Sequence, residues 1–181
     1  MRLILLDRDG TLNQDRTDSV RSPGDIAMIP GAAAAVARLN RAGLRTAIVT
    51  NQSVVGKGII DQAMLERIHD HLRDQLRREG AHIDGWFVCT DPPGRPSDRR
   101  KPEPGMLHEA MRQFGVSAGE TVMIGDDLRD LQAAAAAGCR RILVRTGKGA
   151  SVQARGLPPD VLPVGVHEDL AGAVAALLGE A

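Results

Sequence analysis

Residues 2–11 read RLILLDRDGT, and this stretch decides the fold of the chain. The four apolar residues at 3–6 predict a strand buried on both faces, as at the centre of a parallel sheet. Asp7 and Asp9 follow at the carboxyl end of that strand, where open α/β sheets bind their ligands. Two acids so close together favour a divalent cation between them. An ordinary surface turn is the alternative, since Asp and Gly are common turn residues.

Further along the chain, segments that predict strands alternate with segments that predict helices. The remaining predicted strands are 45–49, 86–89, 121–124 and 141–144, and the predicted helices are 32–42, 62–79, 106–114, 128–137 and 169–178. This alternation indicates an α/β class with a doubly wound, Rossmann-like parallel sheet in three layers. At 181 residues the chain is long enough for one domain, 1–181, and too short for two large ones.

Composition excludes several classes of partner. Lysine plus arginine and aspartate plus glutamate both number 23, so no net charge attracts nucleic acid or an anionic membrane. Aromatic residues make up 2% of the chain, which removes the platforms on which nucleic-acid bases stack. The first strand begins at once, no apolar run reaches membrane-spanning length, and Cys89 and Cys139 lie far apart. We therefore expect a cytoplasmic protein with no nucleic-acid or membrane partner. A monomer is expected as well, although composition does not determine the oligomeric state.

Polar side chains recur at the ends of successive predicted strands. They are Asp7 and Asp9 after the first strand, Thr50 and Asn51 after the second, Lys101 in the loop after the third, and Asp126 and Asp127 after the fourth. Because the carboxyl ends of parallel strands share one edge of a sheet, we expect these side chains to lie together. A carboxylate nucleophile, a metal and donors for phosphoryl oxygens are what phosphoryl transfer through an aspartyl-phosphate requires.

These residues resemble the four motifs of the haloacid dehalogenase-like phosphatase superfamily, and the resemblance spans most of the chain. It implies that Asp7 attacks phosphorus. It also implies that Asp9 protonates the leaving oxygen and then activates water, for which we expect a raised pKa. A signalling receiver domain shares the aspartyl-phosphate chemistry, but its acceptor follows its third strand, where this chain has Cys89-Thr90-Asp91.

The same resemblance implies the ligands of the metal and of the phosphate. Mg²⁺ is expected at the carboxylates of Asp7 and Asp126 and at the backbone carbonyl of Asp9, with Asp127 supporting the loop or a metal-bound water. Phosphoryl oxygens are expected at Thr50, Asn51 and Lys101. The segment between Asp9 and Thr50 is too short for a large helical cap, so an open site is expected.

At finer scale the chain resembles the D-glycero-D-manno-heptose 1,7-bisphosphate 7-phosphatases and the related histidinol-phosphate phosphatases. The matching stretches are Thr50-Asn51-Gln52-Ser53, residues 100–107, residues 131–134 and residues 144–148. The resemblance implies a sugar bisphosphate as substrate, with Arg100 on the distal phosphate and Lys57 and Lys148 assisting. Histidinol phosphate or another small phosphomonoester is the alternative substrate.

One part of the pattern is missing. Both families usually carry a zinc loop of Cys-x-His and Cys-x-Cys before the Arg-Lys-Pro motif. Aligned from Lys101, the four ligand positions fall on Cys89, Asp91, Ser97 and Arg99. Because one thiolate and one carboxylate do not make a closed tetrahedral site, no zinc is predicted. Val54 stands where the family usually has Gly.

The sequence also bears on two other classes of function. A mutase or phosphotransferase needs a lid that excludes water, and no segment is long enough for one. A sugar-phosphate sensor that binds without turnover is the remaining alternative, although neither Asp7 nor Asp9 is missing.

His69 and His71 fall on the helix 62–79 and point in different directions, so we expect surface histidines rather than a metal site.

Overall fold

A computed structural model describes residues 1–180 of the chain. Its centre is a parallel sheet with the strand order β3-β2-β1-β4-β5-β6. The strands are β1 (Leu3–Leu6), β2 (Arg45–Asn51), β3 (Gly85–Cys89), β4 (Thr121–Gly125), β5 (Arg140–Val144) and β6 (Gly165–His167). The apolar run at 3–6 is fully buried between β2 and β4, as predicted. The short edge strand β6 was not predicted, because three residues carry no readable period.

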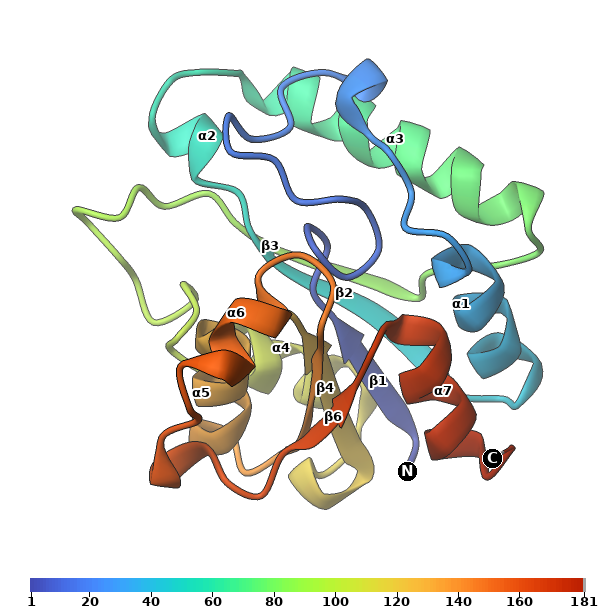
Figure 1. The fold of residues 1–181 in the computed structure, drawn as a ribbon. Helices are drawn as coiled ribbons and strands as arrows, with labels where there is room; N and C mark the ends of the chain where they lie inside the picture. Colours follow the sequence, from blue (N-terminus) through green and yellow to red (C-terminus); the bar gives the residue numbers. More distant parts are fainter. Residues whose placement is uncertain (181) are drawn as a thin grey trace.

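Helices connect the strands and cover both faces of the sheet (Figure 1). They are α1 (Ala32–Arg41), α2 (Ser53–Gly56), α3 (Gln62–Arg78), α4 (Gly105–Phe114), α5 (Leu128–Ala136), α6 (Gly149–Ala154) and α7 (Leu170–Leu178). Single turns of 3₁₀ helix occur at Pro23–Asp25, Ala118–Glu120 and Pro159–Val161. The five longer helices match the predicted ones closely, whereas α2 and α6 are too short to show an apolar face in the sequence.

Alternation along the strands divides the core into two layers. Ile4 and Leu6 of β1 face a cluster with α1, α3 and α7, whereas Leu3 and Leu5 face α4 and α5. Successive side chains of a strand point to opposite faces, so a run of apolar residues serves both layers. The three-layer α/β architecture is therefore confirmed.

The carboxyl ends of the strands meet at one edge of the sheet, where the long loops gather (Figure 1). After β1 the chain makes an irregular excursion to residue 31, with one 3₁₀ turn. Within residues 1–180, no cap domain stands over this edge.

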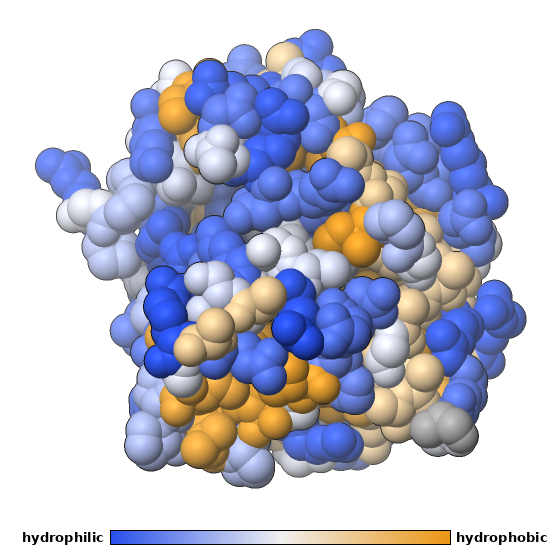
Figure 2. Space-filling view, viewed as in Figure 1, coloured by the Kyte–Doolittle hydropathy of each residue, from blue (hydrophilic) through white to orange (hydrophobic). Residues whose placement is uncertain are grey.

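The surface differs between the two ends of the molecule. The loops at the upper end are mainly hydrophilic, and hydrophobic atoms gather lower in the view, near α6 and the segment that leads to β6 (Figure 2). Leu162 in that segment is half exposed. None of the helices within residues 1–180 combines the length and the apolar character that crossing a membrane requires.

Candidate active site

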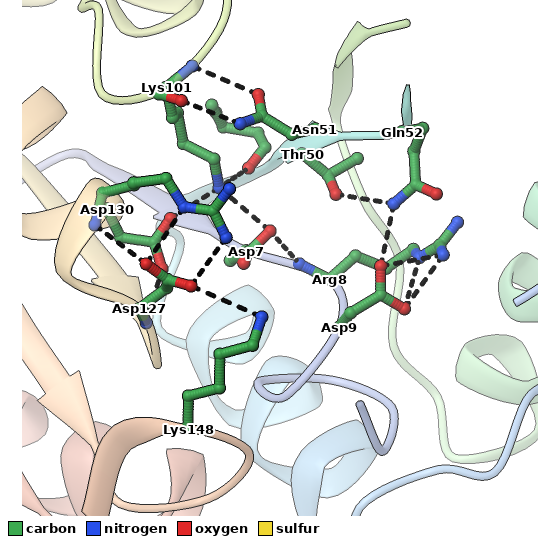
Figure 3. A network of polar contacts seen from close by, with 12 residues as sticks. Asp7, Arg8, Asp9, Thr50, Asn51, Gln52, Lys101, Asp127, Asp130 and Lys148 are labelled. Atoms are coloured by element: carbon green, nitrogen blue, oxygen red, sulfur yellow. Dashed lines mark hydrogen bonds and ion pairs between the residues drawn. The ribbon is translucent and has the colours of Figure 1, made fainter. Parts of the chain in front are cut away.

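A buried lysine joins two carboxylates at the centre of the strand edge. The Lys101 ammonium lies 3.0 Å from Asp7 Oδ1 and 2.6 Å from Asp130 Oδ1, and it donates to the Val49 carbonyl at 2.8 Å. Burial alone would lower the pKa of Lys101, but the charges of Asp130 and Asp7 outweigh burial and raise it. Lys101 is therefore a fixed positive charge beside Asp7 (Figure 3).

Three carboxylates form a cluster around this lysine. One oxygen each from Asp7, Asp126 and Asp130 lies within 4.8 Å of the others. Burial and the neighbouring acids raise the pKa of Asp126 to about 8. Burial, partly opposed by Lys101, raises the pKa of Asp7 to about 6. The raised values mean that Asp126 keeps its proton at neutral pH unless a further positive charge offsets the repulsion within the cluster.

This donor set suits a hard divalent cation. Oxygen ligands from carboxylates with room for water are the environment that Mg²⁺ prefers. A cation among these carboxylates would remove the repulsion that raises the pKa values of Asp7 and Asp126. The clustering of Asp7 with Asp126 agrees with the sequence prediction, and Asp130 is an additional member.

Asp130 was missed because nothing in the sequence separates it from a helix-capping acid. It lies in the first turn of α5, where its Oδ2 accepts from the Asp127 amide at 3.0 Å. Its other oxygen accepts from Lys101. The available signal was its spacing, three residues after Asp127, which is that of a capping box.

Two glycines allow Asp126 to enter the cluster. A Cβ on Gly10 would lie 2.1 Å from Asp126 Oδ2, and so would a Cβ on Gly147. Both residues also have positive φ, +82° and +55°. Asp126 is held further by the Lys148 amide, which donates to its Oδ2 at 2.8 Å. Side chains at these glycines would displace the carboxylate.

Asp9 lies beside the cluster, in a cage of donors. Its oxygens accept from the guanidinium of Arg8, at 2.9 Å from Nη2, from Asn13 at 2.9 Å and from Gln52 at 2.8 Å. Burial would raise the pKa of Asp9, but the Arg8 charge and these hydrogen bonds together lower it. The expected raised pKa is therefore wrong for this state of the protein.

The residues at the carboxyl end of β2 order the site from the other side. Asn51 exchanges two hydrogen bonds with the backbone of Lys101, at 2.9 and 3.1 Å. Gln52 donates to Thr50 Oγ1 at 2.9 Å as well as to Asp9. Asn51 thus fixes the loop that carries Lys101, and Gln52 links Asp9 to Thr50.

Asp127 has a different environment from Asp126. It caps α5 by accepting from the Arg129 amide at 3.1 Å, and it pairs with the Arg129 guanidinium at 2.7 Å. Burial would raise the pKa of Asp127, but the hydrogen bonds and charge of Arg129 lower it. Its second cation is Lys148, at 3.4 Å, which also pairs with Asp15 at 3.2 Å.

These groups line a cavity of about 340 Å³. Of the predicted residues, the lining includes Asp7, Asp9, Thr50, Asn51, Arg100, Lys101, Asp126, Asp127 and Lys148. Lys57 is exposed after α2 and does not belong to the lining. The sequence analysis gave no site role to the others, which are Asp15, Arg16, Thr17, Ser19, Gln52, Ser53, Val54, Arg129 and Asp130.

Most cations of the cavity are paired with acids. Arg16 pairs with Asp18 at 3.0 Å, and Arg129 and Lys148 are paired as described above. Arg100 is buried and donates to the backbone carbonyl of Asp91 at 2.8 Å. Within residues 1–180, Arg100 is thus the lining arginine without a carboxylate partner.

The loop after β3, which includes the positions compared with zinc ligands in the sequence analysis, is closed by polar contacts. The Asp91 carboxylate accepts from the amide of Ser97 at 2.9 Å and from its hydroxyl. Arg99 pairs with Glu109 of α4 at 2.8 Å. Cys89 is buried. Residues 91–100 are closed by the contact between Asp91 and Ser97, and we call them the clasped loop.

The expectation for His69 was wrong. Its side chain is buried, with 1% exposed, and its Nε2 lies 3.3 Å from Arg8 Nη1. His71 is half-buried and contacts Gln75 of the same helix. The apolar positions of α3 extend to position 69, and sequence alone did not show that a buried arginine meets it there.

The parallel sheet, the acidic cluster and the buried lysine at the strand ends define a haloacid dehalogenase-like hydrolase, and the HAD-hydrolase-like family model matches residues 98–173. The D-glycero-β-D-manno-heptose-1,7-bisphosphate 7-phosphatase of Bordetella bronchiseptica is 42% identical over 181 residues, 100% of both chains. The Pseudomonas aeruginosa protein of that name is 38% identical and covers 97% of each chain. The chain belongs to the heptose-1,7-bisphosphate 7-phosphatase family.

Solved structures agree with this assignment. The D,D-heptose 1,7-bisphosphate phosphatase of B. bronchiseptica, complexed with magnesium and phosphate, has a TM-score of 0.94 over 100% of both chains at 42% identity. The enzyme of that name from Burkholderia thailandensis has a TM-score of 0.75 at 35% identity, over 98% of this chain and 99% of its own.

Proposed function

We propose that this protein is a Mg²⁺-dependent phosphatase that converts D-glycero-D-manno-heptose 1,7-bisphosphate to heptose 1-phosphate. The observation that carries the proposal is the contact of Asp7 with Lys101 beside the cluster of Asp126 and Asp130, at the base of an open polar cavity. The names of the bacterial relatives, similar over nearly the whole chain, supply the substrate.

The chemistry has two steps. An oxygen of Asp7 attacks the phosphorus of the 7-phosphate, the bond from phosphorus to the sugar oxygen breaks, and that oxygen takes a proton from Asp9. Water then attacks the phosphorus of the aspartyl-phosphate and gives a proton to Asp9, and inorganic phosphate leaves from Asp7. Lys101 and Thr50 stabilise the charge on the phosphoryl oxygens.

Asp9 has two protonation states in this cycle. In the donor cage its carboxyl is ionised at neutral pH, because its pKa is lowered. It is therefore ready as the base of the second step, and it must take up a proton before it serves as the acid of the first step.

The metal site is assigned to the carboxylates of Asp7 and Asp126 and the backbone carbonyl of Asp9. Asp127 and Asp130 stand next to these groups and orient the first turn of α5. Mg²⁺ bound there supplies positive charge that offsets the repulsion between nucleophile and phosphate.

A distal phosphate subsite is assigned to Arg100. Its guanidinium lines the cavity and has no acidic partner within residues 1–180, so it is free to pair with a phosphate. Lys148, on the opposite loop, assists once it replaces one of its two carboxylate contacts with a contact to the phosphate. Lys57 lies outside the cavity lining, so a contact from it requires movement of the turn after α2.

The test is phosphate release with Mg²⁺ from heptose 1,7-bisphosphate, fructose 1,6-bisphosphate and histidinol phosphate, with the released position assigned by ³¹P NMR. Asp7→Asn should lower kcat by about a thousandfold or more, because the nucleophile is lost. Asp74→Asn, at an exposed site on α3, is the control. Equal rates with and without Asp7 would reject the mechanism and favour a sensor. A strong preference for histidinol phosphate would reject the substrate alone.

The remaining assignments concern the assembly and its surroundings. We propose a single-domain monomer, which light scattering can check. Cys89 and Cys139 are buried free thiols, as expected in the reducing cytoplasm. Zinc should be substoichiometric in the purified protein by metal analysis.

A further inference from the structure

The side chain of Arg8 is a charge that the two catalytic steps do not use. It is 1% exposed, and within residues 1–180 its one carboxylate partner is Asp9. Its Nη2 donates to both oxygens of Asp9 at 2.9 Å, and its Nε approaches Oδ1 at 3.3 Å. Such a two-oxygen contact fixes the plane of the carboxylate as well as its place.

The far side of the guanidinium is held by α3. Nη1 of Arg8 lies 3.3 Å from Nε2 of His69, which is 61 residues away in the sequence and equally buried. Arginine can only donate, so His69 must accept through Nε2 and carry its proton on Nδ1. Burial and the charges of Arg8 and Arg73 lower the pKa of His69 to about 3, which agrees with a neutral acceptor.

His69 is itself fixed by packing. Its ring lies 4.8 Å from that of Trp86 at the start of β3, and Arg73 covers the Trp86 ring at 4.5 Å. The orientation of the Asp9 carboxylate is therefore connected through Arg8 to a layer of side chains built by α3 and β3. Asn13 and Gln52 complete the donor cage.

We infer that Arg8 and His69 are positioning residues that hold the carboxylate of Asp9 in the orientation needed for proton transfer. Without His69, Nη1 of Arg8 would be a buried donor without an acceptor, and the guanidinium would turn toward another partner and draw Asp9 with it. Small displacements of a catalytic group lower the rate of the chemical step more than they affect substrate binding. This inference rests on the proposed phosphatase function.

The test compares His69→Leu, which removes the acceptor, with His69→Gln, whose side-chain oxygen can still accept from Arg8. His71→Leu, two residues along the same helix, is the control for changes to α3. Each protein is assayed with Mg²⁺ on heptose 1,7-bisphosphate and on p-nitrophenyl phosphate. The nitrophenolate ion leaves without a proton, so its release depends less on a general acid.

His69→Leu should lower kcat for the sugar bisphosphate by about tenfold, a fraction of what a general acid contributes, with KM little changed. The loss on p-nitrophenyl phosphate should be smaller, and His69→Gln should recover most of the rate. Unchanged kcat in His69→Leu, or equal losses on both substrates without recovery in His69→Gln, would overturn the inference.

A measurement on the unmodified protein removes the dependence on variant folding. ¹⁵N NMR of the His69 imidazole should show Nε2 without a proton and Nδ1 with one. A proton on Nε2 would overturn the hydrogen bond to Arg8 and with it the inference. Failure of the proposed function has a different result, namely no phosphate release by the unmodified protein from either substrate.

Discussion

At the scale of single residues, the site depends on how buried charges are paired. Asp7, Lys101 and Asp126 could be predicted because each follows a strand of a parallel sheet, and strand ends share an edge. The partners of these residues could not be predicted. That Asp130 joins Lys101, and that His69 meets Arg8, depends on side-chain directions that only the packed structure fixes.

Lys101 balances two buried carboxylates, so its loss should affect stability as well as catalysis. Lys101→Met in the metal-free protein leaves Asp7 and Asp130 without a counter-ion and should lower the free energy of unfolding by roughly 3 kcal/mol. Adding Asp130→Asn should recover part of this stability without restoring phosphate release, because the donor to the phosphoryl oxygens is still missing. Urea unfolding and phosphate release measure the two effects. A double variant as active as Asp130→Asn alone would contradict the role of Lys101.

Gly10 offers a second test at this scale. Gly10 and Gly43 both have positive φ, +82° and +74°, so alanine at either should cost about 1 kcal/mol of stability through backbone strain. Only at Gly10 would the new Cβ meet Asp126, at 2.1 Å, whereas nothing lies within 4 Å at Gly43. Gly10→Ala should therefore lower kcat by about a hundredfold, and Gly43→Ala should not. Similar kcat values for the two variants would show that Asp126 tolerates displacement.

At the scale of elements, length decided what could be predicted. The strands of the sheet interior and the helices of nine or more residues carry a full apolar pattern, and they were predicted with small errors at their ends. The elements α2, α6 and β6, with four, six and three residues, are too short to repeat such a pattern, and they form because their neighbours are in place. The order of the clasped loop was not predictable either, since it depends on a contact between Asp91 and Ser97.

The clasped loop leads directly to Arg100, which donates to the carbonyl of Asp91. Asp91→Asn weakens the hydrogen bonds to Ser97 and should raise KM for heptose 1,7-bisphosphate about fivefold, the effect of roughly one lost hydrogen bond. Steady-state kinetics on p-nitrophenyl phosphate, which has no distal phosphate, should show little change. Asp98→Asn removes the same charge from an exposed position in the loop and is the control. An equal rise in KM for both substrates would show that the clasped loop does not act through the distal phosphate.

At the scale of the whole molecule, the acidic cluster links stability to pH and to the metal. All elements that carry Asp7, Asp126 and Asp130 converge on this cluster, from β1, β4 and α5. The pKa values are raised to about 6 for Asp7 and about 8 for Asp126. Raised pKa values in the folded state mean that the contribution of these groups to stability is complete below their ordinary value of 3.8 and is lost as the pH rises through 6 and 8.

Magnesium should reverse this loss. At pH 6 the cation must displace protons from Asp126 and from part of the Asp7 population, whereas at pH 8 fewer protons compete with it. The rise in thermal midpoint on adding saturating Mg²⁺ should therefore be larger at pH 8 than at pH 6, as differential scanning fluorimetry can measure. The titration of groups outside the cluster affects the thermal midpoint equally with and without the metal, so it cancels in the difference between the two samples. In Asp126→Asn the rise should be smaller and should depend less on pH, because only Asp7 still exchanges a proton for the metal in this range. An equal rise at both pH values in the unmodified protein would place the metal elsewhere than among these carboxylates.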